Sequence, residues 1–213
     1  MIDNAAKQVT GVLLAGGLSR RMGGGDKCLR DLAGKPMLAH VIERLSPQVG
    51  AMVINANGDP ARFARFALDV VPDTVGGFAG PLAGVLAGMR WSASHAPEAR
   101  WIVTVSTDAP FVPLNLTQQL LSAVAGDRTI ALAASGGDVH PVIGLWPVAL
   151  ADDLEAQLES GVRKVLHWTG RHSSVVVEFP FLRLHGRMID PFFNANTPEE
   201  LDEARALIES RSQ

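Results

Sequence analysis

Glycine and basic residues are concentrated in residues 13–29, LLAGGLSRRMGGGDKCL, directly after the apolar run VTGVLL. Gly16 and Gly17 allow the backbone to pass close to a ligand or to adopt a positive φ. The same loop carries three cations, which are Arg20, Arg21 and Lys27. Backbone N–H groups and these cations would form an anion cradle that suits a polyphosphate better than a single carboxylate. The loop therefore predicts a site for nucleotide phosphates, with a solvated basic loop as the alternative.

Two common nucleotide-binding motifs do not fit this loop. The P-loop requires G-x-x-x-x-G-K-[ST], whereas Lys27 follows Asp26 and precedes Cys28. The dinucleotide fingerprint requires G-x-G-x-x-G at the start of a helix, and GLSRRMGGGDK lacks that spacing. A P-loop NTPase and an NAD-dependent oxidoreductase are therefore disfavoured.

A carboxylate stands at the end of a very apolar run. Asp108 ends the segment WIVTVSTD, and Pro110 favours an extended backbone just there. Mg²⁺ prefers oxygen ligands and binds one or two carboxylates together with phosphate oxygens and water. Asp108 suits such an ion, and a turn or cap aspartate is the alternative. No Ser/His/Asp constellation or zinc-ligand spacing accompanies it, so the sequence gives covalent and zinc-hydrolase chemistry no support.

Apolar runs that predict strands alternate with helical patterns. The runs are nearly continuous, as expected of strands covered on both faces, and occupy residues 9–15, 51–56, 68–73, 100–108 and 130–135. Helical periodicity covers residues 36–48, 81–94 and 114–126. We therefore expect an α/β fold, a single Rossmann-like three-layer domain with a mostly parallel twisted sheet and helices on both faces. Ligands bind such sheets at the carboxyl ends of the strands, where the glycine-rich loop begins.

The pattern becomes less regular after Gly136. We expect one domain over residues 1–213, with a nucleotide-binding half at about 9–135 and an acceptor-binding half at about 136–205. The motif NTPEE predicts a capping box at the start of the last helix. Residues 194–196 then lie in the loop just before that helix.

Composition limits the function classes. The chain has 213 residues, a net charge of −3 and one cysteine. This balance argues against a general nucleic-acid binder, and a single cysteine excludes an internal disulfide. The N-terminal residues carry no signal-peptide pattern, and no apolar run reaches the roughly 20 residues that cross a bilayer. We expect a cytoplasmic, monomeric protein without membrane or nucleic-acid partners, in which Cys28 is a small buried apolar residue.

The ordered set of motifs resembles one enzyme family. The pattern L-A-G-G-x-x-x-R-M…K followed by G-K-P is similar to the nucleotidyltransferase signature. The further segments INAN, PD, GPLAGVLAGM, STDAPF, HPVIGLW and NANTPEEL follow in order from residue 54 to residue 201. Together they resemble the molybdenum cofactor guanylyltransferases. One departure is Thr107, where the family often has cysteine, and we expect it to have little effect on the chemistry.

The resemblance implies roles for individual residues. The implied nucleotide-binding residues are Leu14, Ala15, Gly16, Gly17, Lys27, Asn55, Asp73 and Asp108. The implied catalytic residues are Arg21, Lys27 and Asp108, with Asp108 as the metal ligand. The implied acceptor-binding residues are His140, Asn194 and Asn196.

Each assignment has a structural alternative. Asn55 can be a strand-end turn residue, Asp73 can close an Asx-turn, and the two asparagines can support the cap of the last helix. His140 can be a structural histidine. Residues 80–84, GPLAG, can approach a flat ring or an anion, or simply allow tight packing of a helix on the sheet.

The resemblance implies transfer of GMP from GTP to the phosphate of molybdopterin, or its molybdenum-loaded form, with Mg²⁺ and with release of pyrophosphate. The implied mechanism is direct in-line attack, with catalysis by positioning and electrostatics. The same reaction with CTP, or with another phosphorylated acceptor, is the nearest alternative. A non-catalytic nucleotide-binding regulator is the alternative from another class. Contacts with upstream and downstream cofactor proteins are also expected.

Overall fold

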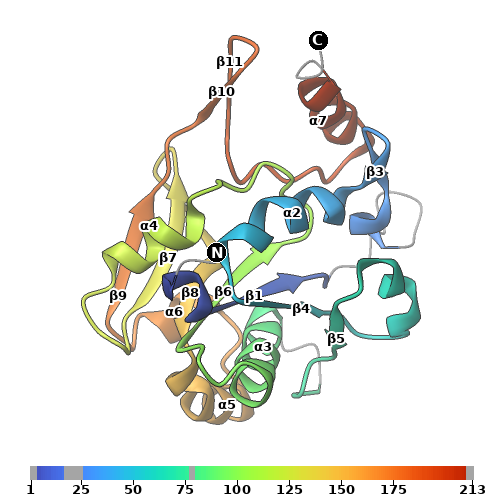
Figure 1. Cartoon of the computed structure of the whole chain (residues 1–213). Coiled ribbons are helices and arrows are strands. Elements are labelled where there is room, and N and C mark those ends of the chain that lie inside the picture. The colour runs from blue at the N-terminus through green and yellow to red at the C-terminus, as the bar shows by residue number, and fades with distance from the viewer. Residues whose placement is uncertain (1–3, 17–25, 77–79, 210–213) are drawn as a thin grey trace.

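The computed structural model describes residues 4–16, 26–76 and 80–209 (Figure 1). Its centre is a seven-stranded sheet in the order β5-β4-β1-β6-β8-β7-β9. The strands are β1 (Val9–Leu14), β4 (Ala51–Asn55), β5 (Asp69–Val71), β6 (Trp101–Ser106), β7 (Ile130–Ser135), β8 (Asp138–Pro147) and β9 (Ser174–Glu178). Every neighbouring pair is parallel except the two that include β8. The predicted mostly parallel α/β sheet is confirmed.

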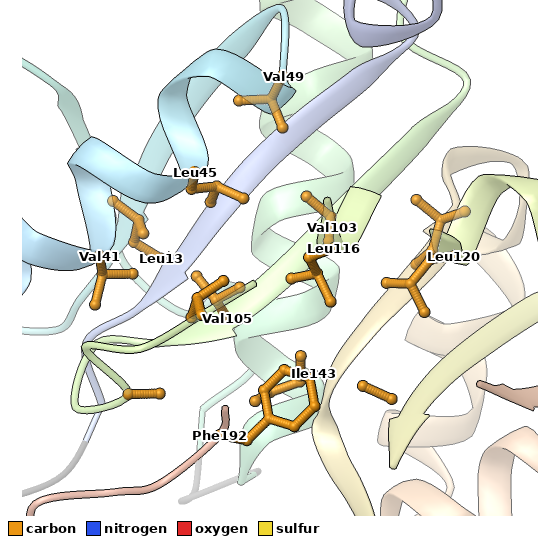
Figure 2. Packing of buried hydrophobic residues seen from close by; sticks show 14 of the residues in the cluster. Leu13, Val41, Leu45, Val49, Val103, Val105, Leu116, Leu120, Ile143 and Phe192 are labelled. Carbon is orange, nitrogen blue, oxygen red and sulfur yellow. The ribbon is translucent and has the colours of Figure 1, made fainter. Parts of the chain in front are cut away.

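Helices cover both faces of this sheet. The helices are α1 (Asn4–Lys7), α2 (Met37–Leu45), α3 (Pro81–His95), α4 (Leu116–Ala123), α5 (Ala151–Glu159), α6 (Val165–Thr169) and α7 (Pro198–Glu209). Buried residues of α2 and α4 pack on one face, as Figure 2 shows for Val41, Leu45, Leu116 and Leu120. Buried residues of α3, α5 and α6 form a second core on the other face. The predicted three-layer arrangement is therefore confirmed.

Strand β1 shows why the apolar runs are nearly continuous. Alternate residues point to opposite faces of a strand, so Val9 and Leu13 join the core beneath α2 while Val12 joins the core beneath α3. Helix α3 approaches β1 closely through Gly88, where an added Cβ would lie 2.5 Å from Val12 Cγ2. Gly84, within the GPLAG segment, also lies close to the sheet, because an added Cβ there would lie 2.7 Å from Leu14 Cδ2. This fits the tight-packing interpretation of residues 80–84, and their approach to a ligand stays a prediction.

The reversal of β8 follows from a two-glycine turn. Gly136 and Gly137 both have positive φ, at 58° and 87°, and they connect Ser135 to its cross-strand partner Asp138. Such a turn joins antiparallel strands. The chain therefore folds back on itself after Gly136, and His140 lies opposite Ala133 of β7.

A third apolar cluster holds the C-terminal helix to the edge of the molecule. Leu201, Ala204 and Leu207 of α7 pack with Leu32 and Met37. The capping box is confirmed, because the Thr197 backbone N–H donates to Glu200 Oε2 and the Glu200 N–H donates to Thr197 Oγ1. The loop before α7 is thereby fixed near the start of α2.

Shorter elements connect these layers. Two small hairpins are formed by β2 (Asp31–Leu32) with β3 (Lys35–Pro36), and by β10 (Leu182–Leu184) with β11 (Arg187–Ile189), which projects from the body in Figure 1. Short 3-10 helices occupy Lys27–Leu29, Ser46–Gln48, Pro60–Phe66 and Val148–Leu150. No helix in the described residues is long and apolar enough to cross a membrane.

The boundaries of α2 and α4 differ from the sequence expectation. The predicted helix over residues 36–48 ends at Leu45 and continues as a 3-10 turn, because Pro47 removes a backbone donor. Pro36 is the residue before that helix rather than its first residue. The helix predicted over 114–126 runs only from Leu116 to Ala123, and Val124 returns to extended backbone.

Candidate active site

Three parallel strands end side by side at one edge of the sheet. Leu14 at the end of β1 is in register with Asn55 of β4 and with Ser106 of β6. Asp108 follows Ser106 by two residues, and Asp73 follows β5 on the far side of β4. The carboxyl ends of the strands thus bring together residues from four separate segments, as the sequence predicted.

Lys27 lies between Asp108 and the loop before α7. Its Nζ is 2.6 Å from Asp108 Oδ2 and 2.6 Å from Asn196 Oδ1. The Lys27 and Asp108 side chains are 13% and 20% exposed, so the ion pair is largely shielded from water. A partly buried pair of this kind is screened less by salt than a surface pair. The structure therefore assembles Lys27, Asp108 and Asn196 into one charged cluster.

Ser106 is a member of this cluster that the sequence analysis missed. Its hydroxyl donates a hydrogen bond to Asp108 Oδ1. The carboxylate of Asp108 is thus held from both oxygens, by Ser106 and by Lys27. The segment STDAPF contained the signal, since Ser106 ends β6 and Asp108 lies in the turn that follows, only two residues away.

The loop before α7 is attached to Asp108 through the backbone as well. The Ala195 N–H donates to the Asp108 carbonyl oxygen at 3.2 Å. The Asn196 N–H donates to Glu200 Oε2, so the backbone of Asn196 serves the cap of α7 while its side chain points to Lys27. Asn194 Oδ1 is buried, and within the described part of the chain it has no hydrogen-bond partner. The Asn196 side chain takes no part in the cap of α7, because its Oδ1 accepts from Lys27 and its Nδ2 donates to the Asn194 carbonyl oxygen at 3.3 Å.

Asp73 is held by two asparagines. Asn55 Nδ2 donates to Asp73 Oδ1 at 3.0 Å, and Asn57 Nδ2 donates to Asp73 Oδ2 at 2.8 Å. Asn55 also donates to the Val71 carbonyl oxygen and is only 5% exposed. Both N–H groups of the Asn55 amide are thus used within the protein. Its predicted nucleotide contact stays a prediction, and in this arrangement Asn55 acts on Asp73.

Arg62 connects the segment before Lys27 with the loop after β4. Its Nε is 2.9 Å from Asp26 Oδ2, immediately before Lys27, and it also donates to the Asn57 carbonyl oxygen. One guanidinium therefore connects the end of the glycine-rich loop to the asparagine that holds Asp73. Sequence reasoning did not single out Arg62 or Asn57, because their partners are distant in the chain.

His140 lies in a separate polar group with Ser135 and Asp190. Ser135 Oγ is 2.6 Å from His140 Nε2 and 2.8 Å from Asp190 Oδ1. The imidazole also packs against the Phe192 ring, with 4.7 Å between the ring centroids. His140 is not within the Lys27 cluster, but its neighbours begin the segment that leads to Asn194.

The glycine-rich loop is described only at its two ends. Leu14 and Ala15 continue β1, and the Ala15 N–H donates to the Asn55 carbonyl oxygen at 2.9 Å. Gly16 is exposed, and an added Cβ there would have no heavy atom within 4 Å. The predicted contacts of Gly17, Arg20 and Arg21 fall outside the described residues. Their roles stay predictions.

Cys28 is buried in the core beneath α2, as predicted. Burial raises the pKa of its thiol to about 11. The thiol is therefore protonated at neutral pH and is a poor nucleophile. Thr107, which departs from the cysteine expected from the family resemblance, is buried and donates to the Leu14 carbonyl oxygen at 3.2 Å.

The oxygen atoms near Lys27 define what metal the site can hold. Asp108, Ser106 and Asn196 offer carboxylate, hydroxyl and amide oxygens. These are the hard donors that Mg²⁺ accepts, with phosphate oxygens and water completing its six ligands. No group of three or more His, Cys, Asp or Glu residues able to hold a metal occurs in the described residues. The donor set fits a hard divalent cation such as Mg²⁺.

Comparison with known proteins identifies the family. Residues 11–175 match the model of the MobA-like NTP transferase domain. The molybdenum cofactor guanylyltransferase of Bradyrhizobium sp. (strain ORS 278) is 54% identical over 209 residues, covering 97% of this chain and 96% of that protein. The chain belongs to the molybdenum cofactor guanylyltransferase family.

Further relatives agree with this assignment. The family member from Rhodopseudomonas palustris (strain BisB5) is 52% identical over 204 residues, covering 94% of this chain and 95% of that protein. Among solved structures, molybdopterin-guanine dinucleotide biosynthesis protein A from Archaeoglobus fulgidus has a TM-score of 0.68 at 22% identity. The alignment covers 94% of this chain and 99% of that one, and it supports the fold.

Proposed function

We propose that this enzyme transfers GMP from GTP to the phosphate of molybdopterin, or of its molybdenum-loaded form, and releases pyrophosphate. Family membership supports the reaction class. The observation that carries the proposal is the position of Lys27 Nζ, 2.6 Å from both Asp108 on the nucleotide side and Asn196 on the acceptor side. A single cation between the two halves suits a reaction in which phosphates from two substrates meet.

The reaction needs no protein nucleophile. An acceptor phosphate oxygen attacks the α-phosphorus of GTP, a new P–O bond forms, and the bond from the α-phosphorus to the bridging oxygen breaks. The leaving pyrophosphate carries away the electron pair of that bond. The acceptor phosphate is already ionised, so no general base is required. The buried, protonated Cys28 thiol is consistent with this route.

Lys27 supplies fixed positive charge where phosphate charge develops. Preorganised cations in a shielded site stabilise such charge without reorganisation during the reaction. Arg21 is proposed to act with it. The Lys27 ammonium pairs with the Asp108 carboxylate, so the two groups hold each other in place before substrates bind.

Mg²⁺ is proposed as the cofactor, held by Asp108, where it would neutralise phosphate charge. Ser106 holds one carboxylate oxygen of Asp108 in position, and Lys27 contacts the other. These contacts hold both oxygens of the Asp108 carboxylate in place. The Asn194 and Asn196 side chains are proposed to contact the acceptor.

Guanine recognition is proposed for the turn that follows β1. Leu14, Ala15, Gly16 and Gly17 would present backbone groups to the nucleotide, and Asp73 would accept hydrogen bonds from it. The side-chain amides of Asn55 and Asn57 each donate to one oxygen of Asp73 and so keep its carboxylate oriented. A carboxylate held in this way suits an N–H donor of guanine or a ribose hydroxyl.

Pyrophosphate release measured with each nucleotide tests the proposal. Purified enzyme with Mg²⁺ and molybdopterin should release pyrophosphate with GTP and much more slowly with CTP. Faster release with CTP would place the chain on the cytidylyl branch. Release with neither nucleotide, together with tight GTP binding, would favour a nucleotide-binding regulator.

The proposed product also implies partners. A labile cofactor must be passed on, so we include contacts with the proteins that supply molybdopterin and that receive the dinucleotide. A monomeric chain in the cytoplasm completes the proposal.

A further inference from the structure

A buried polar group lies next to the segment that leads to Asn194 and Asn196, the residues proposed to contact the acceptor. Ser135 ends β7 and is 3% exposed, His140 lies on β8, and Asp190 follows β11. Ser135 Oγ is 2.6 Å from His140 Nε2 and 2.8 Å from Asp190 Oδ1, and Asp190 Oδ2 is 4.0 Å from His140 Nε2. Ser135 thus lies between the imidazole and the carboxylate.

The number of protons in this group fixes the direction of its hydrogen bonds. A serine hydroxyl has one proton, and an ionised carboxylate can only accept. Ser135 therefore donates to Asp190 Oδ1, and its oxygen must accept a proton from His140 Nε2. The imidazole carries its proton on Nε2, and Nδ1 is the ring nitrogen left for another partner.

This arrangement differs from a hydrolytic triad. In a triad the aspartate contacts the histidine and the other imidazole nitrogen contacts the serine. Here Asp190 contacts the serine itself, and one nitrogen of His140 faces both residues. The Ser135 hydroxyl is buried and donates to a carboxylate, so it is not an activated nucleophile. The group fixes a side chain rather than performing hydrolysis.

Asp190 and His140 also hold the segment that leads to Asn194. Asp190 Oδ1 accepts the Phe192 N–H at 2.8 Å, and the Phe193 N–H donates to the Asp190 carbonyl oxygen at 3.1 Å. Phe192 is 1% exposed and lies in the same core cluster as Ile143 (Figure 2). Its ring also packs against the His140 imidazole. The Asp190 carboxylate therefore holds the imidazole, through Ser135, and also holds the segment that leads to Asn194.

We propose that Ser135 and Asp190 are positioning residues that hold the His140 imidazole protonated on Nε2 and leave the lone pair of its Nδ1 to accept a hydrogen bond from an N–H or O–H group of the phosphate-bearing acceptor. This inference rests on the proposed function, because it takes the acceptor to bind beside the loop before α7. Neither residue contacts the acceptor itself. Both act through His140.

Steady-state kinetics of Ser135→Ala separate positioning from simple stability. The variant should raise the KM for molybdopterin about fivefold to tenfold, as expected for one lost hydrogen bond that orients a ligand contact, and should leave the KM for GTP unchanged. Ser92→Ala is the matched control, because Ser92 is also a buried hydroxyl, bonded to Thr10 Oγ1 at 2.7 Å in the core beneath α3. The control should lower stability with no change in the KM for molybdopterin. An unchanged KM in Ser135→Ala, or an equal rise in the control, overturns the proposal.

Two substitutions of Asp190 test the role of its hydrogen bonds further. Asp190→Asn keeps an oxygen that can accept from Ser135 and from the Phe192 N–H, whereas Asp190→Ala removes both bonds. The asparagine variant should therefore retain most of the acceptor affinity that the alanine variant loses. Equal kinetic effects of the two substitutions would contradict positioning of His140 through the hydrogen bonds of Asp190.

A spectroscopic measurement reads the imidazole without the reaction. In ¹⁵N-labelled protein the NMR signal of the His140 Nε2 proton can be identified, because it is missing from the spectrum of His140→Gln. This proton should be protected from exchange with water in the wild type. It should lose that protection in Ser135→Ala. Protection that persists in the variant refutes the positioning role, even if the kinetics change. If the wild type releases no pyrophosphate with molybdopterin while the proton is protected, the acceptor role and the proposed function fail and only the positioning of the ring stands.

Discussion

The Lys27 ammonium lies 2.6 Å from the Asp108 carboxylate, although 81 residues separate them in the chain. The pair forms where the short turn after the glycine-rich loop meets the end of β6. Its partial burial means that removing one partner leaves the other with an uncompensated charge. The roles of the two residues can be separated by experiment. Substitution of Asp108 should affect the metal ion, whereas substitution of Lys27 should affect the phosphates.

Asp108→Asn tests the metal ligand. The substitution removes a charge with little change in shape, so folding should survive while Mg²⁺-dependent turnover falls by on the order of 10²-fold or more. Asp127→Asn is the control, since Asp127 makes an exposed ion pair with Arg100 on the surface. Near-normal turnover in a folded Asp108→Asn protein would remove Asp108 from the metal site.

Lys27→Ala tests the phosphate cradle. If the ammonium acts in the transition state, kcat/KM for GTP should fall by an amount equivalent to roughly 2–4 kcal/mol. Lys35→Ala provides the comparison, because Lys35 pairs with Glu43 at the surface. Unchanged pyrophosphate release at subsaturating GTP would show that this loop does not hold the phosphates.

Asn194→Ala and Asn196→Ala test the acceptor side. Each should raise the KM for molybdopterin while the affinity for GTP stays close to wild type, which titration calorimetry can measure. Asn115→Ala is a control at an asparagine that precedes α4 and makes no side-chain cap bond. Weakened GTP binding with intact acceptor binding would reverse the assignment.

A melting scan with four nucleotides tests base selection. A ligand that binds only the folded state stabilises it by about 2.7 kcal/mol at 100 times its Kd. For a chain of this size the melting temperature should rise by roughly 5–10 °C. Mg·GTP should give that shift, and Mg·CTP, Mg·ATP and Mg·UTP much less, because a wrong base leaves buried polar groups unpaired. An equal or larger shift with CTP would refute guanine selection.

His40 makes stability depend on pH. It is buried on α2 with Nε2 2.7 Å from the Leu32 carbonyl oxygen, and burial lowers the pKa of its imidazole below the ordinary 6.5. The unfolded chain therefore binds this proton more readily than the folded one. Its contribution to stability is complete above the unfolded pKa and is lost as the pH falls below 6.5.

Urea unfolding at a series of pH values checks this dependence. His40→Gln keeps an N–H donor but cannot take up a proton, so the fall in unfolding free energy between about pH 7.5 and pH 5.5 should be smaller than in wild type. His95→Gln, at an exposed histidine of α3, should leave the wild-type dependence unchanged. Identical pH curves for wild type and His40→Gln would exclude His40 as the source.

Much of the fold was predictable because the signals are local. A run such as residues 100–108 buries both faces of a strand, and its composition alone indicates this. The capping box at Thr197 and Glu200 depends on four consecutive residues. The same holds for the placement of Asp108 at a strand end, where the alternation of strands and helices predicts a ligand site.

The site contacts were less predictable because they join distant segments. The Lys27–Asn196 contact spans 169 residues and requires α7 to dock beside α2. The use of the Asn55 amide by Asp73 could not be read from either segment, since it follows from the parallel pairing of β4 and β5.

The sequence by itself determined the order of elements, the faces they bury and the residue types at the strand ends, because hydrophobic periodicity and capping act over a few residues. Only the tertiary structure decided which polar groups meet. The turn at Gly136 and Gly137 reverses β8 and brings His140 back to Ser135, and the return of the chain after β11 places Asp190 on the same hydroxyl. Hydrogen bonds form over about 3 Å, so a pattern that predicts elements to within a residue or two cannot specify them. The packing of the whole sheet does.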